Sequence, residues 1–176
     1  MRNVVTKTLL SAVPVLCAVL LVADEAPRVK LQDDCDPTTF NAAVGPGTCD
    51  RENGGDTTFA NFIAQVTKLK KAPEWRFDPS SGDASAGSRV RLENDGGETH
   101  SFTRVDQFGG GLVPVLNILS GNPVVAPECA SPNVFATFVN SGQEVRGPKL
   151  DPSDRGKTVK FQCCIHPWMR AEITVR

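Results

Sequence analysis

The densest group of chemically active side chains is the segment Cys163-Cys164-Ile165-His166-Pro167-Trp168-Met169, near the C-terminus. It places a thiol, an imidazole and a thioether within seven residues, between a predicted strand and the final strand. The other histidine, His100, follows a turn at the start of an earlier predicted strand, so the two segments can face one another. Two imidazoles and one thiolate in a plane, with a weak axial thioether, form the ligand set of an electron-transfer copper site. These residue types therefore favour copper chemistry.

Composition and spacing exclude several other chemistries. The 176-residue chain has two histidines, six cysteines and no tyrosine, so a site built from several histidines is impossible. The adjacent cysteines do not fit the Cys-x-x-Cys-His motif of covalent haem, and structural zinc usually needs paired Cys-x-x-Cys or histidine pairs. A thioredoxin-like motif fails on the same spacing. A Cys–His nucleophile pair stays open, although the distant His100 and Met169 fit a metal better.

Two separated segments resemble the cupredoxins, the family of small blue copper proteins. The spacing of Cys163, His166 and Met169, followed by an Ile-Thr-Val strand, is similar to the copper loop of the plastocyanin and amicyanin-like bacterial branch. The stretch Gly87–Asn94, followed by His100, resembles the upstream half. The resemblance implies one type 1 copper ion. By that resemblance its ligands are His100, Cys163, His166 and Met169, and Asn94 hydrogen-bonds the Cys163 sulfur and ties the ligand loops together.

The choice between the two adjacent cysteines follows from strand alternation. Neighbouring strand residues face opposite sides, so Cys163 shares the core-facing side with Phe161 while Cys164 points outward. Cys129 is the expected disulfide partner of Cys164. Cys35 and Cys49 lie fourteen residues apart in a turn-rich segment and form the second predicted pair.

The N-terminus has the pattern of a secretory signal. Arg2 and Lys7 precede an apolar run from Leu9 to Ala23, which ends at Asp24 and Glu25 and is too short to span a bilayer as a helix. We expect residues 1–23 to be a cleaved signal, with an uncleaved anchor as the alternative. The remaining chain is then periplasmic or extracellular, where disulfides persist, and has no further membrane span.

The elements expected to position the ligands form an all-β domain. Residues 24–71 read as an N-terminal extension, loop-like over 24–56 and helical at about 57–70, with Pro73 ending the helix. Residues 72–176 contain short alternating stretches separated by turns, which predicts a Greek-key β-sandwich of cupredoxin type. The expected strands lie at 75–77, 90–94, 100–105, 135–139, 159–163 and 171–175.

Two surface features have alternative interpretations. The excursion at 106–134 is too apolar to be freely solvated. We therefore prefer the interpretation that it covers an apolar face of the sandwich, and the alternative is a partner-docking loop. The family resemblance implies that the edge of His166 reaches the surface as the electron port. Pro167 and Trp168 then belong to a docking patch there, or Trp168 is a lid packed over the loop.

The function predicted from sequence is one-electron transfer by an exported, monomeric protein with redox proteins as partners. The alternative is a copper carrier or sequestering protein of the cell envelope. A formal charge of −1 gives no reason to expect nucleic-acid binding. An enzyme is not expected, because four protein ligands leave no position for a substrate.

Overall fold

The computed structural model describes residues 27–51 and 54–176. The signal expected at residues 1–23 lies outside these residues. Within the described chain, no helix combines the length and apolar character needed to cross a membrane.

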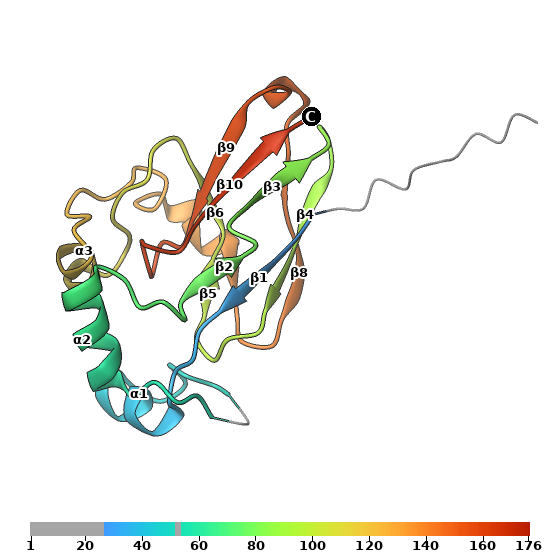
Figure 1. The fold of residues 1–176 in the computed structure, drawn as a ribbon. Coiled ribbons are helices and arrows are strands. Elements are labelled where there is room, and N and C mark those ends of the chain that lie inside the picture. The colour runs from blue at the N-terminus through green and yellow to red at the C-terminus, as the bar shows by residue number, and fades with distance from the viewer. Residues whose placement is uncertain (1–26, 52–53) are drawn as a thin grey trace, which may run out of the picture.

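Two four-stranded mixed sheets pack face to face as a β-sandwich (Figure 1). In spatial order the first sheet contains β2 (Arg76–Asp78), β1 (Arg28–Gln32), β4 (Arg89–Asn94) and β8 (Glu144–Lys149). The second contains β3 (Ser81–Ala84), β10 (Arg170–Val175), β9 (Thr158–Gln162) and β6 (Thr103–Val105). A short ladder pairs β5 (His100–Ser101) with β7 (Phe138–Val139). Most pairs are antiparallel, whereas β1 with β4 and β3 with β10 are parallel.

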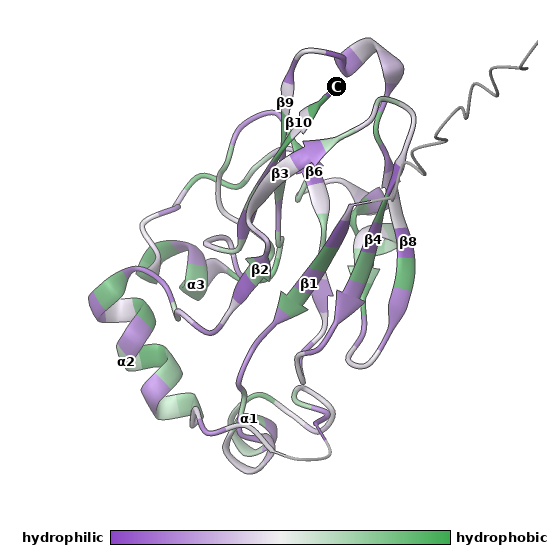
Figure 2. Cartoon of the chain, turned by 45° about the vertical axis from the view of Figure 1, so that its right-hand side comes forward, coloured by the Kyte–Doolittle hydropathy of each residue, from purple (hydrophilic) through white to green (hydrophobic). Residues whose placement is uncertain are grey.

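Strand alternation creates the core between the sheets. In β4 the hydrophobic Val90 and Leu92 alternate with charged residues, a pattern visible in Figure 2, and both are buried. The sheets meet through buried side chains of β1, β2, β4, β9 and β10, which include Leu31, Phe77, Val90, Phe161 and Ile173. The expected β-sandwich is therefore the observed fold.

Helices gather at one end of the sandwich (Figure 1). They are α1 (Pro37–Ala43), α2 (Phe59–Leu69) and α3 (Pro114–Leu119). Elsewhere the described chain forms the 3₁₀ turns η1 (Pro132–Thr137) and η2 (Pro152–Asp154). The helix expected at about 57–70 is α2, which begins after a Thr58 cap on Asn61 N–H and ends at the left-handed Lys70. Phe62 of this helix packs together with Phe40 and Trp75.

The described residues of the 24–56 segment, 27–51 and 54–56, contain more regular structure than their turn-rich sequence predicts. Arg28–Gln32 forms β1, with Val29 and Leu31 in the core, and Pro37–Ala43 forms α1 after an Asp36 cap. The loop expectation is wrong here because both elements are short and their periodicity is hard to recognise. Strands β3 and β8 were also not expected. Conversely, most of the strand expected at 135–139 is η1, since Ser131 caps a turn with Pro132 at its start.

The excursion at 106–134 covers part of the sandwich. Val105, Ala126, Cys129, Val134 and Cys164 form a second apolar cluster beneath it, and Leu116 of α3 joins the main core. Its outer face stays apolar in part, because Val115 and Ile118 are 54% and 70% exposed.

Candidate metal centre

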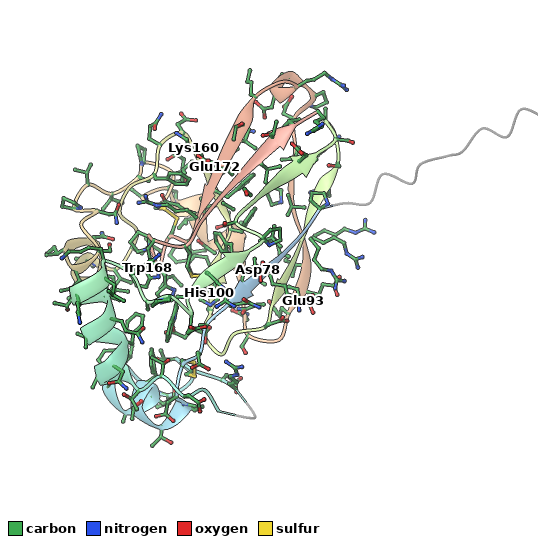
Figure 3. The ribbon with its side chains drawn as sticks, in the orientation of Figure 1. Asp78, Glu93, His100, Lys160, Trp168 and Glu172 are labelled. Atoms are coloured by element: carbon green, nitrogen blue, oxygen red, sulfur yellow. A yellow bond between two sulfur atoms is a disulfide. The ribbon has the colours of Figure 1, made fainter. Side chains whose placement is uncertain are left out.

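Three candidate ligands from two distant segments meet inside the sandwich. Cys163 Sγ lies 4.0 Å from His100 Nδ1 and 3.9 Å from His166 Nδ1. The three ligand atoms all lie within 4.8 Å of one another, and the three residues are buried. Strand β5 supplies His100, whereas Cys163 and His166 lie in the loop between β9 and β10 (Figure 3 labels His100). These three residues could therefore hold a metal ion.

The spacing of these atoms fits a shared ion. A metal about 2.3 Å from a thiolate sulfur and about 2.0 Å from an imidazole nitrogen in a trigonal plane separates the two donors by about 3.7 Å. The observed separations of 4.0 and 3.9 Å need only a small contraction. Both rings direct Nδ1 toward the Cys163 sulfur, so the Nε2 atom of each ring faces away from the site and can contact another residue.

Backbone hydrogen bonds hold the ligand loop in shape. Cys163 N–H donates to the Met169 carbonyl at 3.0 Å, and Met169 N–H donates to the His166 carbonyl at 2.9 Å. The Cys163 sulfur accepts from the N–H groups of Ser101 and His166, both at 3.4 Å. Burial opposes a charged sulfur, but the two histidines outweigh it and hold the pKa of the Cys163 thiol well below its usual range. The sulfur is therefore poised as a thiolate, the form that binds metals.

Asn94 does not make the bond that the family resemblance implies. Its amide nitrogen donates to the carbonyls of Glu98 and Val139, both at 2.8 Å, and its oxygen accepts from Gly96 N–H. Both amide hydrogens are thus used away from Cys163, whose sulfur is bonded by Ser101 and His166 instead. Asn94 organises the turn before His100 and ties it to β7.

Met169, the fourth predicted ligand, is 1% exposed and lies at the end of the same loop. Its backbone bonds to both Cys163 and His166, so its position is fixed relative to them. A coordinating role for its sulfur remains a prediction.

Asp33 binds the outer edge of His100. Its Oδ2 lies 2.8 Å from His100 Nε2, and both side chains are fully buried. Burial raises the pKa of Asp33, but the hydrogen bond and charge of His100 outweigh it and lower that pKa to about 2. Burial correspondingly lowers the pKa of His100, yet Asp33 and Cys163 raise it to about 10. An ionised carboxylate only accepts, so Nε2–H is the donor.

Glu98 takes the same position at the second histidine. Its Oε2 lies 3.4 Å from His166 Nε2 and accepts from Trp75 Nε1–H at 2.5 Å. Burial is the main cause that raises the pKa of this carboxyl. Sequence reasoning missed both carboxylates. The only available signal was their place in an aspartate-rich turn beside Cys35 and a glycine-rich turn before His100.

The family resemblance implies that the edge of His166 reaches the surface, but in the structure it does not. It is 2% exposed and is enclosed by the rings of Phe62, Trp75 and Trp168. Pro167 is buried and Trp168 is half-buried against α2, where Figure 3 places it. Trp168 therefore acts as a lid, and the expected docking patch at these two residues is not an open surface.

The remaining cysteines of the described chain are paired. Disulfides join Cys35 to Cys49 and Cys129 to Cys164, as predicted, and leave Cys163 as the free cysteine among the described residues. Cys164 points away from the metal site into the second apolar cluster.

No protein-family model and no curated protein matches the chain in sequence. Among solved structures, it is similar to a purple cupredoxin from Nitrosopumilus maritimus, with a TM-score of 0.40, 17% identity, and coverage of 85% of this chain and 99% of that one. An oxidised plastocyanin from Dryopteris crassirhizoma gives 0.35 and 18%, with the same coverage. A reduced amicyanin variant gives 0.29 and 12%, over 57% of this chain and 73% of that one. At these identities and scores, the case for a metal depends on the chain's own residues.

Proposed function

We propose that this chain is a type 1 copper protein that carries one electron at a time. His100, Cys163 and His166 would hold the ion in a plane, with Met169 as the weak axial ligand. The observation that carries the proposal is the convergence of two Nδ1 atoms and one thiolate within a buried, hydrogen-bonded site. When bound, copper supplies a reversible one-electron couple.

The donor set favours copper over other metals. A thiolate and a thioether suit Cu(I), and imidazole suits Cu(II), so the mixture can hold both oxidation states. The rigid loop and enclosed rings limit rearrangement between those states. With four protein ligands and no exposed edge at the rings, the site offers no position for a substrate, so we propose electron transfer without catalysis.

The biological setting completes the proposal. The disulfides suit an oxidising compartment, and the N-terminal pattern suggests export to the periplasm or the extracellular space. We propose a monomer that exchanges electrons with redox proteins. A copper carrier would use the same ligands, but burial of all three and closure of the His166 ring by Phe62 of α2 disfavour rapid release of the ion.

The test is to add Cu(II) to the folded protein and record the visible absorption and the EPR spectra. We expect an intense thiolate-to-copper band with narrow hyperfine splitting, and we expect Cys163→Ser to lose both. Zn(II) is the matched control, since it is redox-inert and gives no such band. A protein that stays colourless with Cu(II), or whose colour survives Cys163→Ser, would refute the site. Electron self-exchange faster than copper release to a chelator would separate the shuttle from the carrier.

A further inference from the structure

Both histidines have a buried carboxylate at the nitrogen that faces away from the metal site. Asp33 Oδ2 lies 2.8 Å from His100 Nε2, and Glu98 Oε2 lies 3.4 Å from His166 Nε2. The two carboxylates come from different segments, the turn after β1 and the turn between β4 and β5. From this geometry we infer that Asp33 and Glu98 are positioning residues that fix both imidazoles and lower the reduction potential of the bound copper. The inference rests on the proposed function.

The seat of Asp33 is built to hold a carboxylate. Besides His100, its oxygens accept from the N–H groups of Gly97 and Glu98, both at 2.9 Å, and of Cys35 at 3.2 Å. A Cβ at Gly96 would lie 2.1 Å from Asp33 Oδ2, so this approach is possible only without a side chain there. Four donors from two segments of the chain leave Asp33 one position, and that position fixes the ring of His100.

Glu98 is held by a different contact. Trp75 Nε1–H donates to the oxygen that faces His166, and Trp75 is 1% exposed. The backbone N–H of Glu98 donates to Asp33 at 2.9 Å, and the backbone carbonyl of Glu98 accepts from the Asn94 side chain at 2.8 Å. The two carboxylates therefore belong to one hydrogen-bonded unit, which bonds His100 through Asp33 and has an ion-pair contact with His166 through Glu98.

The electrical consequence follows from charge. A carboxylate hydrogen-bonded to the remote nitrogen of an imidazole makes that imidazole a stronger donor to a metal. A negative charge near the ion stabilises the oxidised state more, because that state carries one more positive charge. In a buried site, water screens this interaction weakly. In a copper-loaded protein, the couple Cu(II) + e⁻ → Cu(I), with the electron supplied by a redox partner, would therefore be shifted toward Cu(II).

Two isosteric variants test the inference in the copper-loaded protein. Asp33→Asn removes the charge and keeps the shape, so it should raise the reduction potential and weaken Cu(II) binding more than Cu(I) binding. Glu98→Gln should have the same direction with a smaller effect, because Glu98 lies 3.4 Å from His166 and burial raises its pKa. Asp34→Asn is the matched control, because Asp34 bonds Thr57 and Asp56 and no imidazole. An unchanged potential in copper-loaded Asp33→Asn, or an equal rise in Asp34→Asn, would overturn the inference.

A second measurement needs neither copper nor a variant. In the Zn(II)-loaded wild-type protein, ¹⁵N NMR should find His100 protonated at Nε2, with that proton strongly shifted downfield and slow to exchange with water. A deprotonated or freely exchanging Nε2 would overturn the role of Asp33 even if the variants fail to fold. If instead the protein takes up no copper while this proton is protected, the proposed function fails and the Asp33–His100 contact stands.

Discussion

Phe62 of α2 packs edge to face against His166, with ring centroids 6.1 Å apart and an interplanar angle of 86°. This contact joins the N-terminal extension directly to the candidate metal centre. Phe62 of the extension, together with Trp75 and Trp168 of the following domain, encloses this imidazole, which is 2% exposed. A residue of the N-terminal extension thus contacts a candidate ligand near the C-terminus.

Phe62→Ala should open this side of the site. Removing a ring that is 2% exposed should cost about 3 kcal/mol or more of the free energy of unfolding. Loss of copper to a chelator should also become faster, because water gains access to His166. Denaturant unfolding and stopped-flow chelation measure the two effects. Phe135→Ala is the control, since Phe135 is 65% exposed and should change both little. Equal chelation rates in Phe62→Ala and wild type would contradict the cover role of α2.

Gly96→Ala should disturb the centre without changing any ligand. The new Cβ would lie 2.1 Å from Asp33 Oδ2, so the carboxylate must move away from His100. We expect a loss of about 1–3 kcal/mol in unfolding free energy and a shifted thiolate-to-copper band. Gly82→Ala is the matched control, because a Cβ there has nothing within 4 Å. Identical spectra and unfolding free energies for the two variants would show that the Asp33 carboxylate can move without affecting the centre.

The two disulfides should differ in their contribution to stability. A chain-entropy estimate gives about 4 kcal/mol for closing the loop of Cys129–Cys164 and about 3 kcal/mol for that of Cys35–Cys49, since the sequence separations are 35 and 14. Replacing each pair with alanines and measuring denaturant unfolding tests the order. A larger loss from the Cys35–Cys49 pair would mean that native contacts, such as the close approach of Gly97 to both sulfurs, outweigh loop entropy.

The clustering of Cys163 and His166 was predictable from sequence because the two residues are close along the chain. Cys163 and His166 lie three residues apart, and the alternation of Phe161 and Cys163 already orients the thiol toward the core. Strands β4, β9 and β10 have clear period-2 patterns. The disulfides followed from assigning the odd cysteine to the metal.

The surroundings of the rings were not predictable in the same way. Asp33 and His100 are 67 positions apart, and an aspartate in a turn-rich segment looks like an ordinary turn residue. Helix α2 was visible from its periodicity, but periodicity does not say which surface a helix covers. The closure of His166 therefore depends on tertiary packing, which no local pattern records.

Asp154, which lies in η2, should make the free energy of unfolding depend on pH. Its hydrogen bond with Arg104 is the main cause that holds its pKa below the ordinary 3.8. A lowered pKa stabilises the fold above pH 3.8, and this contribution is lost as the pH falls through the lower, folded-state value. Asp154→Asn should thus be less stable than wild type at pH 7, and the gap should close in strong acid. Denaturant unfolding across this range measures it, and a gap independent of pH would contradict the charge-based account.

Whether Met169 is a ligand can be tested by the direction in which the reduction potential shifts in two variants. Met169→Leu keeps the volume of a side chain that is 1% exposed, so the free energy of unfolding should change by less than about 1.5 kcal/mol. It removes a donor, which destabilises the more highly charged Cu(II) and should raise the reduction potential. Met169→Gln offers an oxygen, which favours Cu(II), and should lower the potential. Voltammetry of the two variants, with unfolding curves alongside, gives the comparison. Potentials that stay at the wild-type value in both variants would mean that the Met169 sulfur packs in the core without binding copper.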